Sequence, residues 1–576
     1  MLRKALIAVL VAATFVSPTA AATRSTLFPG VDYEKQVLFT LHGPVVLHVI
    51  TAPRPGGLYS LKPLLSNEAI IGRERVTSMQ QRVSSSATVA GVNGDLFNWN
   101  DGHPSGILMR NGVLDSLPLP DRSSIGIDSD GLLRVDRLKA IGNWRGTGQR
   151  RLLRLNQVSA PNAVTLYTPS FGPTTPASTG SLELILDSFP AVTLNSDLTA
   201  PVSSAKSDGG TPIPPGGAVL VARGSQIPFL TTEAAIGQQL VIRFTVNPSW
   251  EGITGAVGGG PVIVRSGAAI FNAAEAFPSN NLMPRNPRTA VGQRADGAII
   301  LVAVDGRQPG YSSGVTNFEL AQAMIRLGAV TASALDSGGS TTMAADGVLL
   351  NRPSDPSGER KVAESLVVAY EGVYAPTASE PVLSPNGDGV AETENLSYKL
   401  VRPSTVSVNL IGPDGVARYT DSGLKPAGVY PLSWNGLNAG GTSESEGRWR
   451  WEIVATDDLA RSSSISRGFW LNNTLGFIAV QPSLVRVGPK GGSLRIDVQL
   501  ARSARLIIRI YSSSGVLLKT IANTTAGPGP YSTRWDGRDG RGKLVFSGRY
   551  QVRATSPGDF GTSQLVSSIV VRRVAK

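Results

Sequence analysis

Two strongly apolar segments of the chain each end in an acidic residue that is followed by a glycine-containing turn. Residues 298–304 lead into Asp305-Gly306-Arg307, and residues 329–335 lead into Asp336 and the loop Ser337-Gly338-Gly339-Ser340. Polar side chains at the ends of buried strands often converge on one crevice. Consecutive free N–H groups in a glycine-rich loop form a nest for an anion, and arginine binds phosphate through two parallel hydrogen bonds.

Two further segments carry similar side chains. Arg285-Asn286-Pro287-Arg288 precedes a strand-like segment, and Asn93-Gly94 follows another one, where left-handed backbone is easily adopted. Each of these motifs alone is typical of an ordinary turn. Together they indicate recognition of a substrate that carries phosphate or sugar.

The cysteine and histidine content narrows the chemistry further. The chain contains no cysteine, which excludes disulfides, thiolate metal sites and cysteine nucleophiles. Its three histidines, His42, His48 and His103, argue against a multi-histidine metal centre. Catalysis must therefore rely on Asp, Glu, Arg, Ser, Asn and backbone groups.

The elements that would position these residues include two predicted helices. Residues 67–83 place apolar side chains at helical intervals, and the segment after Thr316 begins with a capping box, Thr316-x-x-Glu319. Glu319 is assigned to capping for this reason, and not to catalysis. Because the helices alternate with strand-like segments, we predict that the first 350 or so residues form an α+β (mixed α/β) domain.

From about residue 375 onward, helical patterns vanish and short alternating strands dominate. This tail contains a repeat, in which Ser433-Trp434-Asn435-Gly436 aligns with Arg534-Trp535-Asp536-Gly537 at an offset of 101 residues. The offset equals the length of one β-sandwich domain. We therefore predict two all-β Ig-like sandwiches, with these tryptophans in their cores and not on sugar-stacking surfaces.

Six motifs, in order along the chain, resemble the signature of the phosphodiester glycosidase family, typified by the uncovering enzyme, N-acetylglucosamine-1-phosphodiester alpha-N-acetylglucosaminidase. They are Asn93-Gly94-Asp95-Leu96-Phe97, Pro104-Ser105-Gly106, Arg288-Thr289-Ala290, Asp305-Gly306-Arg307, Glu319-Leu320-Ala321 and residues 335–343. The resemblance runs over residues 84–372. The chain departs from the family pattern at Asp95-Leu96, where the family has Gly-Phe, and at Ser337, where it has glycine. Both departures bear on the identity of the substrate.

The tail resembles tandem Ig-like domains of the type found in the flagellar hook-capping protein FlgD, through its repeated Trp-Asp/Asn-Gly and Gly-Arg-Tyr/Trp elements. The sequence thus predicts four segments. They are a signal peptide (residues 1–22), a phosphodiester glycosidase-like domain (23–375), a first Ig-like sandwich (376–475) and a second, basic one (476–576).

The family resemblance implies hydrolysis of a sugar-1-phosphodiester, such as a GlcNAc-1-phosphodiester, at the sugar C1–O bond. A phosphate ester leaves without being protonated, so its growing negative charge mainly needs stabilisation by arginine and backbone N–H groups. A single carboxylate can then stabilise the sugar cation or activate water. Such a reaction is compatible with the few reactive side chains that this chain offers.

On this basis we assign roles to the motif residues. The predicted catalytic carboxylates are Asp336 and, second, Asp305. The predicted substrate- and phosphate-binding residues are Asn93, Arg288, Arg307, Gly338, Gly339 and Ser340, with Asn93 holding either a sugar hydroxyl or the loop itself. Both aspartates have an alternative role, which is to cap the turns in which they lie.

A non-catalytic, glycan-binding envelope protein is the alternative function. The sequence requires no cofactor. In the segment Ser384–Gly389 and just beyond it, Asn386, Asp388 and Glu392 could hold Ca²⁺, which prefers oxygen ligands, although an ordinary turn explains the same residues.

The N-terminal residues predict export. Arg3-Lys4, the apolar run 5–16 and the small residues 20–22 are the three parts of a signal peptide. The apolar run is shorter than the roughly 20 residues that span a bilayer. We therefore expect a secreted or envelope protein without a transmembrane segment, acting on envelope or exopolysaccharide material.

Positive charge is concentrated at the other end of the chain. Residues 476–576 contain 16 Lys/Arg and 4 Asp/Glu, which accounts for the net charge of +12 of the whole chain. Of the totals of 54 basic and 42 acidic residues, 38 of each sign remain in residues 1–475. We predict that the basic repeat docks on an anionic cell-envelope polymer. Specific nucleic-acid binding is not expected, because aromatic–basic interleaving and helical reading motifs are lacking.

Overall fold

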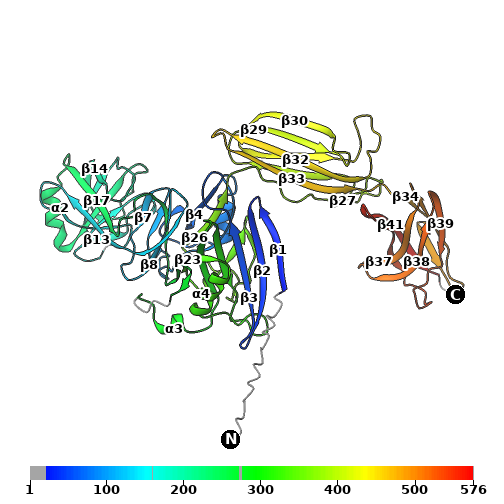
Figure 1. Cartoon of the computed structure of the whole chain (residues 1–576), viewed down its shortest axis with the longest axis horizontal. Coiled ribbons are helices and arrows are strands. Elements are labelled where there is room, and N and C mark those ends of the chain that lie inside the picture. The colour runs from blue at the N-terminus through cyan, green and yellow to red at the C-terminus, as the bar shows by residue number, and fades with distance from the viewer. Residues whose placement is uncertain (1–20, 159, 271–274, 575–576) are drawn as a thin grey trace, which may run out of the picture. The chain divides into compact units, whose positions relative to one another are not determined.

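The computed structural model describes residues 21–158, 160–270 and 275–574. The chain divides into two compact units, residues 1–370 and 371–576, whose elements are labelled in Figure 1. Apart from Ala21 and Ala22, the predicted signal peptide lies outside the described residues. Within the described ranges, no helix has the length and apolar character needed to cross a bilayer.

The α+β class predicted for the first unit is wrong, because strands make up almost all of its regular structure (Figure 1). The helices described are short: α1 (Val76–Arg82), α2 (Ile227–Glu233), α3 (Ser279–Leu282) and α4 (Asn317–Arg326). Of the helix predicted over residues 67–83, only α1 forms. Asn67 and Glu68 have φ angles of 48° and 55°, and this left-handed conformation is incompatible with a right-handed helix. The apolar spacing in this segment instead reflects packing of an irregular loop.

An eight-stranded sheet contains the strands next to Arg288, Asp305 and Asp336. Its order is β1 (Ala21–Phe28), β2 (Val31–Thr40), β3 (Gly43–Ala52), β22 (Ile299–Val304), β21 (Arg288–Arg294), β23 (Ala329–Ala334), β19 (Val262–Arg265) and β20 (Ala268–Ala269). Strand β22 is buried along its whole length, as its continuous apolar run predicts. Helix α4 begins at the predicted capping box between Thr316 and Glu319, and buries Leu320 and Met324 in the core of this sheet.

A second, five-stranded sheet contains the strand that ends at Asn93. Its order is β25 (Val348–Leu349), β24 (Met343–Ala345), β5 (Thr88–Asn93), β26 (Glu364–Tyr370) and β4 (Tyr59–Leu65). Strand β5 lies in the middle and is completely buried, with Asn93 at its end opposite Ser365 of β26. The two sheets meet where β5 and β23 end, because the backbone N–H of Asp336 donates a hydrogen bond to the carbonyl of Gly94 at 3.1 Å.

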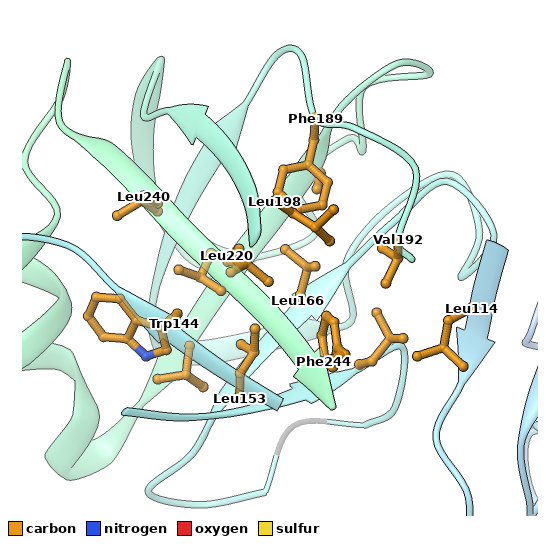
Figure 2. Packing of buried hydrophobic residues seen from close by; sticks show 14 of the residues in the cluster. Leu114, Trp144, Leu153, Leu166, Phe189, Val192, Leu198, Leu220, Leu240 and Phe244 are labelled. Carbon is orange, nitrogen blue, oxygen red and sulfur yellow. The ribbon is translucent and has the colours of Figure 1, made fainter. Parts of the chain in front are cut away.

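Two further sheets complete the first unit. One has the order β7 (Val113–Ser116), β6 (Leu108–Arg110), β18 (Ile253–Gly258), β8 (Ser123–Asp128) and β9 (Leu133–Arg137). The other has the order β14 (Asp197–Pro201), β17 (Gln239–Asn247), β10 (Lys139–Arg145), β11 (Arg151–Leu155), β12 (Val164–Tyr167), β16 (Ala218–Arg223), β13 (Ala177–Leu186) and β15 (Ser204–Gly209). Figure 2 shows the hydrophobic cluster around which this last sheet folds, with Trp144, Leu220 and Phe244 buried together.

The second unit is all-β and contains two separate hydrophobic cores, one from residues 373–471 and one from 475–571. The first is built from β27 (Val382–Leu383), β33 (Ser462–Leu471), β32 (Gly447–Asp457), β29 (Ser404–Ile411) and β30 (Ala417–Lys425), with β28 (Glu394–Leu400) and β31 (Gly428–Trp434). The second is built from β35 (Leu484–Val487), β41 (Gly561–Arg573), β40 (Gly548–Gly558), β37 (Ala504–Ser512) and β38 (Leu517–Ala526), with β34 (Leu475–Gln481), β36 (Leu494–Leu500) and β39 (Gly529–Trp535). Trp434 packs on buried Trp449 and Trp535 is itself buried, so the predicted core role of these tryptophans is confirmed.

Candidate active site

A glycine-rich turn follows β23 at the point where the two sheets of the site meet. Residues Gly338–Ser340 form a single 3-10 turn, and all three are buried. Gly338 has a φ of 69°, which a residue with a side chain rarely adopts. Its N–H donates to the carbonyl of Pro287 at 2.9 Å. The glycines therefore serve the geometry of the turn that holds Asp336 in place.

Asn93 joins β5 to this turn. Its side-chain Nδ2 donates to the carbonyl of Asp336 at 3.0 Å, and its Oδ1 accepts from Thr289 Oγ1 at 2.8 Å and from the N–H of Thr342 at 3.1 Å. Asn93 is completely buried. Of the two roles that we predicted for Asn93, these contacts correspond to holding the loop.

The Asp336 carboxyl group lies within this turn and is only 8% exposed. One oxygen accepts from the N–H of Ser337 at 2.7 Å. Burial, together with the smaller effect of the nearby charge of Asp95, raises the pKa of Asp336 to about 6, against the lowering effects of Ser340, the Ser337 N–H and Arg360. A carboxyl group with a pKa close to neutral can exchange a proton with substrate or water, which is the property needed for acid–base catalysis.

Two guanidinium groups lie against the glycines of the turn. A Cβ atom on Gly338 would be 3.1 Å from Nη2 of Arg307, and one on Gly339 would be 2.0 Å from Nη2 of Arg360. Arg360 is oriented by two hydrogen bonds to Asp355, of 2.7 and 2.9 Å, and it approaches Ser340 Oγ at 3.4 Å. The side chain of Arg307 is exposed, and its Nε donates to Asn286 Oδ1 at 3.0 Å. The turn is thus flanked by two guanidinium groups. Arg360 is already paired with Asp355, so it can reach a phosphate group only through its remaining N–H donors, whereas Arg307 has no carboxylate partner among the ion pairs of the described residues.

An exposed tryptophan lies next to Arg360. The guanidinium of Arg360 is 5.0 Å from the ring centroid of Trp99, and that of Arg73 is 5.8 Å from it. Trp99 is 61% exposed and packs against Phe97, with 5.3 Å between the two ring centroids. An exposed indole beside an arginine is suited to stack on a sugar ring.

A cluster of buried carboxyl groups lies behind Asp336. Asp95 forms an ion pair with Arg122, and its backbone N–H donates to Glu364 Oε1 at 3.1 Å. Burial raises the pKa of Asp95 against the lowering effect of Arg122, and burial together with the charge of Asp95 raises the pKa of Glu364 well above its ordinary value. Of these two carboxyl groups, Asp95 is the one whose charge raises the pKa of Asp336.

Asp305 is placed differently from Asp336, because its carboxylate is occupied by protein donors. His48 Nε2 contacts Oδ2 at 2.9 Å, and Tyr311 donates to the same oxygen at 3.1 Å. Asn351 Nδ2 and the N–H of Arg352 donate to Oδ1 at 3.0 and 3.1 Å. This buried network fits the alternative role that we gave Asp305, which is to hold the turn that contains Arg307.

The guanidinium of Arg288 is also occupied by protein groups. Arg288 is buried and donates to the carbonyls of Val315 at 3.2 Å, Asn281 at 2.6 Å and Pro284 at 2.9 Å. Burial and the neighbouring charge of Arg307 lower its pKa to about 10. In this arrangement Arg288 holds residues 281–284 in place through their carbonyl groups.

The structure therefore joins Asn93, Asp336, the turn Gly338–Ser340 and Arg307 in one place. Asp305 is linked to this group through Asn351, whose Nδ2 also donates to the carbonyl of Thr341 at 3.1 Å. A cavity of about 600 Å³ elsewhere in the first unit, lined by Arg110 and Asp115 among others, contains none of the predicted site residues. The predicted site residues therefore lie outside that cavity.

The residues proposed as calcium ligands form a turn. Asn386 Oδ1 accepts from the N–H of Asp388 at 3.2 Å, Asp388 Oδ1 accepts from the N–H of Val390 at 2.9 Å, and Glu392 Oε1 accepts from the N–H of Gly389 at 3.1 Å. Their oxygens therefore bond to the backbone. In the ranges that the structure describes, no group of three or more His, Asp or Glu side chains is arranged to hold a metal ion.

Sequence reasoning missed Arg360, Trp99, Arg122 and Glu364. Trp99 lies two residues after the motif Asn93–Phe97 and stands between two asparagines, which is a signal for an exposed aromatic side chain. Glu364 begins the apolar strand β26 and Arg360 lies just before it, whereas the acidic residues that we identified follow the ends of their strands. Arg122 has no such signal, because only the tertiary structure brings it to Asp95.

Comparison with known proteins confirms both resemblances. Residues 192–369 match the family model of phosphodiester glycosidases, and residues 485–559 match that of the FlgD Ig-like domain. The first match contains Asp336, Arg307 and Arg360, while Asn93 and Trp99 lie before it. Each match is to a single domain, and neither covers half of the chain.

The individual proteins that the chain resembles share low sequence identity with it or match only a short part of it. An uncharacterized protein derived from the SPbeta prophage of Bacillus subtilis (strain 168) is 38% identical over 90 residues, which cover 16% of this chain and 14% of the relative. The crystal structure of a hypothetical protein from Synechocystis aligns at 27% identity over 59% of this chain and 62% of that one, with a TM-score of 0.49. The zebrafish N-acetylglucosamine-1-phosphodiester alpha-N-acetylglucosaminidase catalytic domain aligns at 14% identity over 61% of this chain and 87% of that one, with a TM-score of 0.31. The chain thus spans less than two thirds of the first two proteins.

Proposed function

We propose that this chain, which carries a phosphodiester glycosidase domain match over residues 192–369, hydrolyses sugar-1-phosphodiesters at the sugar C1–O bond. A GlcNAc-1-phosphodiester in exported envelope or exopolysaccharide material is the substrate class that we propose. The observation that carries the proposal is the position of Asp336, whose carboxyl group lies in a glycine-rich turn flanked by Arg307 and Arg360. The export signal predicted at the N-terminus supports an extracellular site of action.

The reaction follows from the charges of these groups. Arg307 and Arg360 bind the phosphodiester, and the negative charge that grows on the leaving phosphate oxygen is stabilised by the two guanidinium groups. Asp336, which is mostly ionised above its pKa of about 6, accepts a proton from water. The water oxygen forms the new bond to C1, and the old C1–O bond breaks with its electron pair going to the phosphate. The products are a free sugar and a phosphomonoester.

Release of free sugar from a GlcNAc-1-phosphodiester tests this function. We expect turnover by the wild-type chain and a loss of at least about 100-fold in kcat for Asp336→Asn, the scale of a missing general base. Arg360→Gln should raise KM and lower kcat, because it removes one of the two phosphate-binding cations. Arg402→Gln is the matched control, since Arg402 forms an exposed ion pair with Asp458 in the second unit.

The non-catalytic alternative makes a different prediction. A glycan-binding envelope protein would bind sugar-phosphodiesters in a way that depends on Arg360, with no turnover of any member of a substrate panel. Turnover that is unchanged in Asp336→Asn would contradict the proposed role of this residue. The exposed Trp99 is the observation that favours glycan binding, and it is compatible with both functions.

A further inference from the structure

The two repeats of the second unit contain one loop with the same backbone hydrogen bonds. In the first repeat, Asn438 N donates to the carbonyl of Thr442 at 2.9 Å, and in the second, Asp539 N donates to that of Lys543 at 2.8 Å. The pair Glu444 N to Gly436 O recurs as Val545 N to Gly537 O, at 2.9 and 3.0 Å. The indole N–H of Trp434 donates to the carbonyl of Leu437, and that of Trp535 to the carbonyl of Arg538. Residues 434–449 and 535–550 therefore correspond one to one at an offset of 101 residues.

The side chains on this common backbone differ in charge. Three neutral residues of the first repeat, Leu437, Gly440 and Thr442, are replaced by Arg538, Arg541 and Lys543 in the second. Two acidic residues of the first repeat, Glu444 and Glu446, are replaced by Val545 and Ser547. Because the first repeat forms the same loop without the cations, the fold does not require them. The three cations of the second repeat therefore have a role other than folding. Clustered positive charge attracts anionic ligands, so we infer that this role is binding of an anion.

Two of these cations, Arg538 and Lys543, line a cavity in the second repeat. The cavity has a volume of about 840 Å³ and includes Arg538, Lys543 and Arg573 in its lining, with apolar contributions from Leu518 and Tyr550 among others. Phe546, which replaces Ser445 of the first repeat, also lines it and is 76% exposed. The cavity thus combines positive charge with aromatic surface.

The guanidinium groups at the cavity are held in place without being neutralised by acids. Arg573 donates to the carbonyls of Val545 and Leu544, and its guanidinium lies 4.6 Å from the ring centroid of Phe546. Arg538 donates to the carbonyls of Gly542 and Pro489, each at 2.9 Å.

The remaining charges of this loop reinforce the positive surface. Lys543 and Arg541 are exposed, and neither has an ion-pair partner among residues 475–574. Asp539, an acid in the cavity lining, accepts from the N–H groups of Arg541 and Lys543, each at 2.9 Å, and so caps its own turn. The positive charge at the cavity is therefore available to a ligand.

We propose that this cavity is a binding site for a phosphate-bearing, anionic glycan polymer. The fixed guanidinium groups and the free lysine provide several contacts to successive phosphates, for which arginine is well suited. Phe546 and Tyr550 provide apolar surface for the sugar rings of the same polymer. The site is distinct from the Asp336 turn and acts independently of the reaction proposed there.

Binding of the full chain to poly(glycerol phosphate) that carries sugar substituents tests the site. The double variant Arg538→Leu/Lys543→Thr restores the residues of the first repeat on the same backbone, so it is expected to fold normally. We expect it to bind roughly tenfold more weakly, with a slope of log Kd against log salt that is reduced by about two, one for each lost phosphate contact. Phe546→Ser, which also restores a first-repeat residue, should weaken binding with little change in the salt slope.

A matched control distinguishes binding at the cavity from attraction by the net positive charge of the repeat. Arg505 is an exposed cation near the start of β37, and the cavity residue Ser512 ends the same strand. Arg505→Thr should therefore bind the polymer like the wild type. Lys543→Thr, which removes one charge from the cavity lining, should bind it more weakly. Equal weakening by the two single variants would overturn the proposal, as would equal affinity for double-stranded DNA, which lacks accessible pyranose rings. Turnover of a small soluble sugar-phosphodiester should be unchanged in all of these variants. Loss of polymer binding is therefore distinguishable from failure of the proposed hydrolase function.

Discussion

Gly339 and Arg360 are in such close contact that a single methyl group could not fit between them. A Cβ atom on Gly339 would lie 2.0 Å from Nη2 of Arg360 and 2.1 Å from Oδ1 of Asp355. The backbone of Gly339 is not in the left-handed region, so alanine would be excluded only by these side chains. This turn residue therefore determines how closely the arginine approaches the Asp336 loop.

Gly339→Ala should reduce activity far more than stability. The arginine and aspartate ends can move aside, so we expect a loss near the lower end of the about 1–3 kcal/mol that overpacking costs in the free energy of unfolding. A displacement of Arg360 by an ångström or more should lower kcat/KM by roughly 100-fold, because the phosphate is no longer held correctly. Chemical denaturation and steady-state kinetics measure the two effects. Gly216→Ala, where nothing lies within 4 Å of the added methyl, is the control and should change neither.

Asp336→Asn should make the protein more stable at neutral pH while it abolishes turnover. The pKa of Asp336 is raised from 3.8 to about 6 by burial, so between these values the folded state binds more protons than the unfolded state. The wild type therefore loses up to about 3 kcal/mol of stability as pH rises from 4 to 6, and a neutral asparagine does not. Urea denaturation at pH 4 and pH 7 measures this. A variant that is equally destabilised at both pH values would contradict the prediction.

Asp305→Asn should have the opposite effect on stability. The carboxylate accepts hydrogen bonds from Tyr311, Asn351 and the N–H of Arg352, so an amide would turn a donor toward donors in a buried site. We expect a loss of at least about 3 kcal/mol in the free energy of unfolding. Asp458→Asn, at an exposed ion pair with Arg402, should cost less than about 1 kcal/mol. If Asp305→Asn folds as stably as the wild type but is inactive, Asp305 has a catalytic role.

Asp95→Asn should move the pH dependence of kcat toward acid. The charge of Asp95 raises the pKa of Asp336, so its removal should lower the pH at which Asp336 becomes an ionised base. The acidic limb of the pH profile, expected near pH 6 in the wild type, should then appear at a lower pH. Initial rates from pH 4 to pH 8, divided by the folded fraction measured by circular dichroism at each pH, give the midpoint. A midpoint that stays in place or rises would show that the two carboxyl groups are not coupled.

Trp99→Ala should weaken substrate binding with a smaller effect on kcat. Loss of an exposed stacking surface for the sugar is expected to raise KM by roughly five- to tenfold, about 1 kcal/mol of binding. Trp99→Phe keeps an aromatic face and should recover most of this affinity. Leu152→Ala, at an apolar side chain that is 77% exposed in the same unit, serves as the control. An unchanged KM in Trp99→Ala would remove this residue from the substrate site.

The sequence by itself determined the features that depend on neighbouring residues. The apolar run before Asp336 and the glycines after it predict a strand and a tight turn, and both are present. The Thr316 capping box likewise predicts the start of α4, because its hydrogen bonds join residues only three positions apart. The charge difference between the two repeats is a property of composition, so it too could be read directly.

Only the tertiary structure decided which of the predicted groups are available for chemistry. Asp305 and Asp336 follow similar strands, yet His48, Tyr311 and Asn351 surround Asp305, and these donors come from distant parts of the chain. Arg288 is likewise occupied by carbonyl groups that its own motif does not reveal. The fold class was mispredicted for a related reason, since apolar spacing in residues 67–83 reports burial and does not distinguish a helix from a packed loop. Availability depends on contacts between residues far apart in sequence, and the physical reason is that burial and hydrogen-bond partners are properties of the folded chain.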